Sequence, residues 1–164
     1  MENSNAIKLA QIAGVTSSVF LSGFSFSASY LSMPALGLAP INIRLKQWLK
    51  IYDLGKFVSP PLGLASGITW GLLSYSHYGS LAWKNYAAAG FLTFGGTVLW
   101  TVVVMMGTNN ELMEMAKAGK GEKEGDSGAF KDRAETVLSS WDKMNWARIV
   151  LPLVGGAVGM WGML

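Results

Sequence analysis

The side chains that could carry chemistry gather in three short stretches of this sequence. Trp141, Asn145 and Arg148 fall at i, i+4 and i+7, a spacing that places them on one stripe of a helix. Asn109 and Asn110 end a long apolar run. The third stretch combines cations, aromatic rings and a carboxylate: Arg44, Trp48, Tyr52, Asp53 and Lys56. Amide and guanidinium groups donate hydrogen bonds to carbonyl and anionic oxygens, so these stretches are candidates for one polar site.

The residue inventory excludes several other kinds of active site. The 164 residues include no Cys and a single His, His77, which excludes disulfides, thiol chemistry and zinc sites built from Cys and His. A lone axial haem ligand remains possible, because Met and Tyr can also serve. No phosphate loop, no GxSxG and no GxGxxG in a strand context occur, so nucleotide cofactors and serine hydrolysis have no support.

The elements that position these residues are predicted to be membrane helices. The composition is 51% hydrophobic and only 14% charged, whereas soluble domains carry about 25% charged residues. Four uncharged stretches can each cross a bilayer: roughly 9–33, 62–78, 86–107 and from about 146 to the C-terminus. The last is marginal in length unless its helix begins earlier. We expect an all-α, integral membrane four-helix bundle that forms a single domain over residues 1–164.

Basic residues predict how the bundle is oriented. The first and third connections hold eleven of the 13 Lys and Arg, and the opposite face holds Lys8 and Lys84. Positive charge marks cytoplasmic loops, so both larger connections are expected in the cytoplasm and both termini in the lumen or exterior. The excess charge of +3 then lies beside the membrane and requires no nucleic-acid partner. Residues 117–135 mix basic, acidic and small residues, which predicts a mobile polar loop.

Local patterns add two expectations about the helices. Asp132 and Glu135 have the spacing of a capping box, which predicts the start of the last helix there. Glycines recur every four residues in two of the spans, at Gly63, Gly67, Gly71, Gly155 and Gly159. Such ridges let helices approach closely, and we expect tight packing within the chain rather than a dimer interface.

The predicted orientation brings the three polar stretches to one membrane boundary. Each residue also has a simpler explanation: Trp48 and Trp141 as interfacial aromatics, the two Asn as helix caps, Arg148 as a side chain reaching lipid phosphates. Their convergence favours a site, since polar side chains at membrane depth usually face the bundle interior. His77 lies about 25 Å away along its helix and is expected to be interfacial.

Four segments in order resemble the anthrone oxygenase family of small four-helix membrane proteins. They are GFSFSASYLSMPAL at 23–36, WLKIYDLGKFVSPPLGLAS at 48–66, TNNELM at 108–113 and WDKMNWAR at 141–148. The resemblance covers nearly the whole chain apart from 117–135. Its more specific elements are Asn-x-x-Leu at 109–112 and Trp-x3-Asn-x2-Arg at 141–148.

The resemblance implies an oxidoreductase of aromatic polyketide biosynthesis. Members oxidise anthrones to anthraquinones with O₂, and some relatives perform other oxidations or rearrangements of related polyketides. Carried over by position, Arg148, Asn109 and Asn145 become the catalytic candidates. The candidates for binding substrate are Trp141, Asn110, Tyr52, Trp48 and Arg44. An endoplasmic-reticulum-type membrane is implied as well.

This chemistry suits a chain so poor in metal ligands. An anthrone loses its benzylic proton readily because the anion is a delocalised phenolate, and that anion can pass an electron to O₂ without metal or flavin. The expected cofactor is therefore none, with O₂ as co-substrate. Arg148 would stabilise the anion, while Asp53, Tyr52 and water are candidates for the proton acceptor. The competing class is a non-enzymatic tetraspan scaffold or assembly subunit, in which the polar cluster would be only structural.

Overall fold

The computed structural model describes residues 2–118 and 128–164, and every element in these ranges is helical. Four long helical rods run through the molecule. The first consists of α1 (Glu2–Phe26), η1 (Ser27–Ser32) and α2 (Met33–Leu36), and the second is α3 (Ile41–Ser76). The third consists of α4 (Leu81–Gly90), η2 (Phe91–Gly96), α5 (Thr97–Trp100), η3 (Thr101–Met105) and α6 (Met106–Ala118). The fourth is α7 (Gly128–Trp161). The all-α fold with four helices is thus as predicted.

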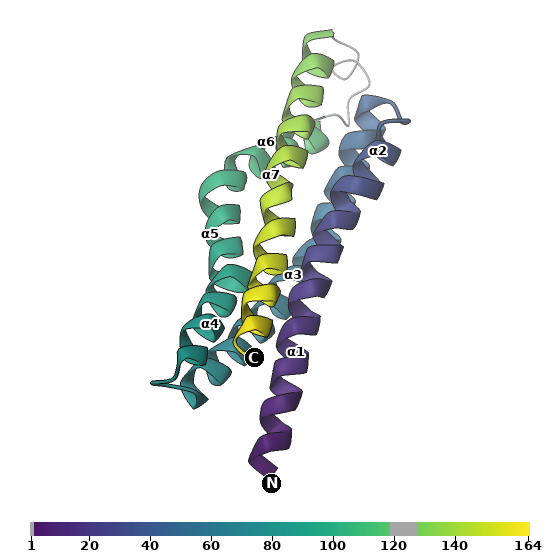
Figure 1. Ribbon diagram of the computed structural model, residues 1–164. Coiled ribbons are helices and arrows are strands. Elements are labelled where there is room, and N and C mark those ends of the chain that lie inside the picture. Colours follow the sequence, from purple (N-terminus) through teal and green to yellow (C-terminus); the bar gives the residue numbers. More distant parts are fainter. Residues whose placement is uncertain (1, 119–127) are drawn as a thin grey trace.

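The rods run alternately up and down, so the two termini lie at the same end of the bundle (Figure 1). We call this the terminal end; it also carries the turn between α3 and α4, in which Gly79 has the positive φ of 86°. The opposite end, where α2 leads into α3 and where α6 ends and α7 begins, is the connection end. Three rods meet there with the residues of the predicted polar site.

Two helix boundaries differ from the sequence prediction. The helix that was expected to begin after Pro60 and Pro61 is continuous from Ile41, with both prolines inside it. The last helix begins at Gly128, so Asp132 and Glu135 lie within its first turns and do not cap it. Residues 119–127 of the predicted 117–135 loop lie outside the described residues, but 128–135 are helical, so the predicted loop extended too far. The turns at 128–135 are helical although their composition is polar, because residues such as Ala134 pack into the buried cluster at the connection end.

Glycines in two rods allow close approach within the chain, as expected. A Cβ at Gly159 would lie 2.2 Å from the Trp70 ring, and one at Gly155 would lie 2.5 Å from Oγ1 of Thr93. Gly63 and Gly67 receive the Phe94 side chain, whose ring lies 3.3 Å from the Cβ position of each. Gly71, by contrast, faces open space. The ridges therefore serve helix packing inside the bundle.

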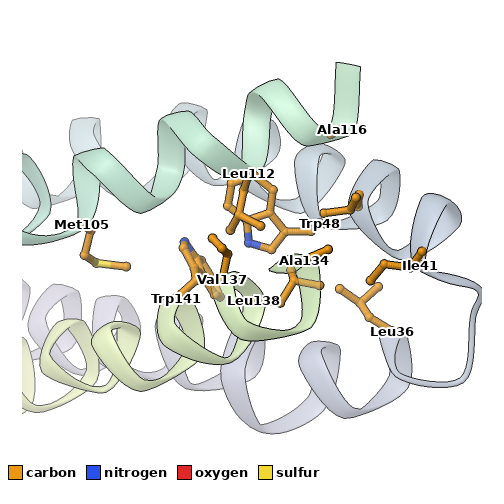
Figure 2. Close-up of a cluster of buried hydrophobic side chains, with 11 residues drawn as sticks. Leu36, Ile41, Trp48, Met105, Leu112, Ala116, Ala134, Val137, Leu138 and Trp141 are labelled. Carbon is orange, nitrogen blue, oxygen red and sulfur yellow. The ribbon is translucent and has the colours of Figure 1, made fainter. Parts of the chain in front are cut away.

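Buried side chains form two clusters, one toward each end. The connection-end cluster is drawn in Figure 2 and comprises Leu36, Ile41, Leu45, Trp48, Met105, Leu112, Ala116, Ala134, Val137, Leu138 and Trp141. The terminal-end cluster comprises Trp70, Leu73, Tyr86 and Ala89. Between them the rods diverge enough to leave a cavity, described below.

The outer surface of the bundle is largely apolar. Large hydrophobic side chains are exposed on all four rods, including Leu9, Ile12, Phe20, Phe57, Ile68, Leu72, Leu99, Val103, Val150 and Leu153. By length and composition, two rods are apolar enough to cross a membrane: Ser4–Leu36 and Leu81–Ala118. Helix α3 is uncharged over 57–76, and 20 residues of helix rise about 30 Å, the thickness of a bilayer's hydrocarbon core.

Candidate active site

The polar stripe of α7 faces the bundle interior. Asn145 is 1% exposed, and its amide Nδ2 donates to the backbone oxygen of Ser25 at 3.0 Å and to Oγ of Ser29 at 2.9 Å. A backbone carbonyl can only accept, so these contacts fix which way the amide points. Both amide hydrogens are thereby committed to the first rod. The Oδ1 atom is left as a hydrogen-bond acceptor.

Asn109 holds the indole of Trp141. Its Oδ1 accepts a hydrogen bond from Trp141 Nε1 at 2.9 Å, and both side chains are buried. Trp141 also meets Trp48 edge-to-face, with ring centroids 5.7 Å apart. Asn109 itself does not line the cavity, whereas Trp141 does. Asn109 therefore contacts the cavity only indirectly, through the Trp141 indole that it holds.

A cavity of about 280 Å³ lies between the rods, directly beside this stripe. Small-molecule sites occupy about 300–1,000 Å³, so the volume suits a compact ligand. Most of its wall is apolar. Its polar members are Ser25, Tyr52, Lys56, Ser59, Thr93, Thr97, Thr101, Asn145 and Arg148, together with the indole of Trp141. The combination of an apolar wall with a few convergent polar groups is typical of small-molecule binding sites.

Arg148 brings an uncompensated positive charge to this cavity. Its Nε atom is buried without a hydrogen-bond partner, and no salt bridge joins it to any described acidic residue. Among the described residues that line the cavity, none is Asp or Glu. A buried cation without a partner is costly, and an anionic ligand would relieve that cost. The geometry therefore fits a ligand that is, or becomes, negatively charged.

Tyr52 and Lys56 stand one helical turn apart on α3, and both line the cavity. The Tyr52 ring stacks on Trp48 with centroids 5.1 Å apart, and Lys56 Nζ lies 4.8 Å from the centroid of the Tyr52 ring. Lys56 Nζ also lies 2.8 Å from Oδ1 of Asp53. Asp53 does not reach the cavity wall.

The third rod contributes polar residues that the sequence analysis missed. Thr93, Thr97 and Thr101 follow one another at intervals of four residues and all line the cavity. Their hydroxyls are engaged: Thr93 with Ser18 at 3.1 Å, Thr97 with the backbone of Leu92 at 3.3 Å, Thr101 with the backbone of Thr97 at 2.8 Å. Their helical spacing within an uncharged span was the signal that could have revealed them.

Three segments of π-helix also contribute to the wall. Ala28 comes from η1, Thr93 and Phe94 from η2, and Thr101 and Val102 from η3. A π-helical turn contains more residues than an α-helical turn and often occurs at functional sites. The π-helical segments therefore lie where the bundle contains the cavity.

Other predicted residues lie away from the cavity. Arg44 forms a salt bridge with Glu135 and donates to the backbone oxygens of Leu36 and Gly37, so it braces the turn between α2 and α3. Asn110 is exposed, because consecutive residues point in different directions around a helix and Asn109 faces the interior. Trp48 does not line the cavity but packs against the rings of Tyr52 and Trp141, which do.

His77 lies at the terminal end, as expected. It follows α3 and packs against Tyr86 with ring centroids 5.1 Å apart. In the described part of the chain, no group of three or more His, Cys, Asp or Glu side chains is placed to hold a metal ion.

Comparison with known proteins supports one family. The family model described as anthrone oxygenase matches residues 48–158. The chain is 30% identical to an anthrone oxygenase of Claviceps purpurea, over 92% of this chain and 86% of that protein. It is 30% identical to an anthrone oxygenase of Aspergillus fumigatus (95% and 93% covered) and 27% identical to a noranthrone monooxygenase of Aspergillus flavus (97% and 75%). No solved structure gives a significant match. The chain belongs to the anthrone oxygenase family.

Proposed function

We propose that this protein is a membrane oxygenase that converts an anthrone-type aromatic polyketide to an anthraquinone with O₂. The observation that carries the proposal is the apolar cavity into which Arg148 brings a positive charge that no acidic residue balances. Family membership and relatives named for anthrone and noranthrone oxidation support the same reaction. One anthrone and one O₂ give one anthraquinone and one water.

The reaction divides into steps that the cavity residues can assist. Removal of a proton from the benzylic carbon leaves the delocalised anion, whose phenolate oxygen faces Arg148. The anion passes one electron to O₂, and the resulting radical and superoxide combine to form a carbon–oxygen bond. Loss of the second benzylic proton breaks the O–O bond and releases water, leaving the new carbonyl. Arg148 stabilises the charge that develops in the first step.

Tyr52, in its tyrosinate form, is the proposed proton acceptor. Of the two protein candidates, Tyr52 lines the cavity, while Asp53 lies outside the wall and is paired with Lys56. Asn145 offers its free Oδ1 to a hydroxyl of the substrate, since both of its amide hydrogens are engaged. The indole of Trp141, held by Asn109, provides a flat wall for the aromatic rings.

Neither metal nor flavin is required in this proposal, because the substrate anion supplies the electron and O₂ accepts it. The chain contributes no Cys and one His, which lies at the terminal end. Turnover that persists in the presence of a strong chelator is therefore the expected behaviour.

The surface of the bundle supports a membrane location. Exposed apolar side chains cover all four rods, and charged side chains concentrate at the connection end. We place the connection end in the cytoplasm and both termini in the lumen or exterior. The resemblance alone points to an endoplasmic-reticulum-type membrane.

The experiment is quinone formation and O₂ uptake by detergent-purified protein given emodin anthrone, with chelator present. Anthrones oxidise spontaneously, so a no-protein sample sets the background. A rate far above that background supports the oxygenase and its independence from metal. A rate equal to the background, also with other anthrones, would favour rearrangement of a related polyketide or a non-enzymatic scaffold.

A further inference from the structure

The walls of the cavity are closed on most sides. Toward the terminal end, Phe94 packs 3.0–3.3 Å from the Cβ positions of Gly63 and Gly67. Toward the connection end, Trp141 and the rest of the connection-end cluster fill the space (Figure 2). Side chains thus close the cavity along the axis of the bundle.

Two of the lateral sides are closed as well. Between α1 and α3, the Phe24 ring lies 3.9 Å from the Cβ position of Gly55. Between the third rod and α7, Trp100 Nε1 donates to the backbone oxygen of Met144 at 2.9 Å. These contacts leave the side between α3 and the middle of the third rod.

That side is open. Helix α3 packs against α4 and η2 below the cavity and against α6 above it, but it is not closely packed against α5 or η3 between them. The cavity residues at this gap are themselves exposed: Val98 by 41%, Val102 by 55% and the Lys56 side chain by 51%, with Pro60 also exposed. The cavity therefore opens sideways, between Lys56 and Pro60 on one helix and Val98 and Val102 on the other.

The surroundings of this opening are apolar. Phe57 is 80% exposed beside Lys56, and Val103 is 76% exposed beside Val102. Lys56 is the last charged residue before the uncharged part of α3, and Val98 lies near the middle of the span Leu81–Ala118. An opening at this height in an apolar surface faces the hydrocarbon of a bilayer just inside its cytoplasmic boundary.

We propose that the substrate enters the cavity sideways from the bilayer, through the opening between Lys56, Pro60, Val98 and Val102. This inference rests on the proposed function and specifies its substrate class as a free, planar, lipid-dissolved aromatic. A polyketide still attached to a water-soluble carrier protein would not reach an opening that faces the hydrocarbon. The reaction that supplies the substrate must therefore release it from its carrier before this enzyme acts.

The test compares two double variants on the same helical segment: one narrows the opening, and the matched control leaves the opening unchanged. V98F/V102F adds two rings at the opening, whereas L99F/V103F adds two rings at neighbouring exposed positions that do not line the cavity. In nanodiscs, V98F/V102F is expected to lower kcat/KM for emodin anthrone at least fivefold. L99F/V103F is expected to stay within twofold of the unmodified protein. Equal values for the two variants would overturn the proposal.

Two further measurements keep the inference separate from the proposed function. The association rate of the product anthraquinone, followed by quenching of tryptophan fluorescence, should fall in V98F/V102F and not in L99F/V103F, whether or not turnover occurs. An anthrone joined through an ether to a long polyethylene glycol, which stays out of the bilayer, should be oxidised only at the background rate. Enzymatic oxidation of that conjugate at the rate of free anthrone would contradict entry from the bilayer.

Discussion

Two buried tryptophans, one toward each end of the bundle, show how similar residues serve different purposes. Trp70 donates its Nε1 to Ser18 at 3.1 Å, and Trp141 donates its Nε1 to Asn109 at 2.9 Å. Trp70 is enclosed by glycines: Cβ positions of Gly14 and Gly159 would lie 2.8 and 2.2 Å from its ring. Trp141 instead lines the open cavity. Both indoles have their N–H group hydrogen-bonded. Where small neighbours pack closely, as around Trp70, the ring stabilises the bundle. Where the neighbours leave a cavity, as around Trp141, the ring can contact a ligand.

The polar atoms differ between the two regions in the same sense. Around Trp70, Ser18 also contacts Thr93, and Gln11 donates to the Tyr86 hydroxyl at 2.8 Å. Around Trp141, the buried Nε of Arg148 has no partner and belongs to a charged group on the cavity wall, whereas the unpartnered buried atom one turn from Trp70 is the neutral Oγ of Ser66, which does not line the cavity. An unpaired buried donor costs stability, so a charged one is expected where a ligand can use it. The comparison assigns stability to the Trp70 region and chemistry to the Trp141 region.

The largest effect in the following series is expected from Tyr52→Phe. Loss of the proton acceptor should lower kcat about a hundredfold, the lower part of the range for general base catalysis. Rates are measured after subtraction of spontaneous oxidation. Asp53→Asn is the control and should keep near-normal turnover; unchanged turnover by Tyr52→Phe would assign the proton to water.

A smaller effect is expected from Asn109→Leu. Without its acceptor the Trp141 indole loses its fixed orientation, and kcat/KM should fall about tenfold while the protein remains folded. Asn109→Asp keeps an acceptor oxygen and should recover most of the activity. A purely structural role would lower thermal stability in Asn109→Leu without changing the kcat of the folded fraction, which separates the two explanations.

The terminal-end region should affect stability rather than turnover. Gly159→Ala places a methyl group against the Trp70 ring and should lower the free energy of unfolding by about 1–3 kcal/mol. Gly71→Ala, which faces open space, should be close to neutral. Thermal unfolding in detergent and kcat per folded protein are the measurements. A large fall in kcat for Gly159→Ala with unchanged stability would break the division between the two regions.

The sequence predicted the parts of this structure that depend on charge and helical periodicity. Charge-free stretches located four helices in order, and the i, i+4, i+7 spacing correctly joined Trp141, Asn145 and Arg148 on one face. Periodicity could also have separated Asn109 from Asn110, since neighbouring residues lie about 100° apart around a helix. The sequence predicts Arg44 as a substrate-binding residue, and this prediction is not supported by the cavity. The pairing of Arg44 with Glu135 could not be predicted, because it depends on how distant segments pack.

The features that escaped prediction depend on packing. The cavity exists where two rods contain three π-helical segments, and no residue pattern marked those segments in advance. The first described turns of α7 are helical despite their polar composition, and Ala134 in them packs in the connection-end cluster. The three threonines share one face of the third rod, which their spacing could reveal, but that this face lines a cavity depends on packing between rods.

The most direct test of the central claim is turnover by Arg148→Leu compared with Arg133→Leu. Arg133 is an exposed cation at the same end of the molecule, paired with Glu111 and remote from the cavity, so its replacement controls for lost charge. Emodin anthrone oxidation is measured at equal amounts of folded protein, with chelator present. The expected result is a loss of at least about a hundredfold for Arg148→Leu, typical of removing a group that stabilises developing charge, and near-normal turnover for Arg133→Leu. Normal turnover by Arg148→Leu would contradict the site described above.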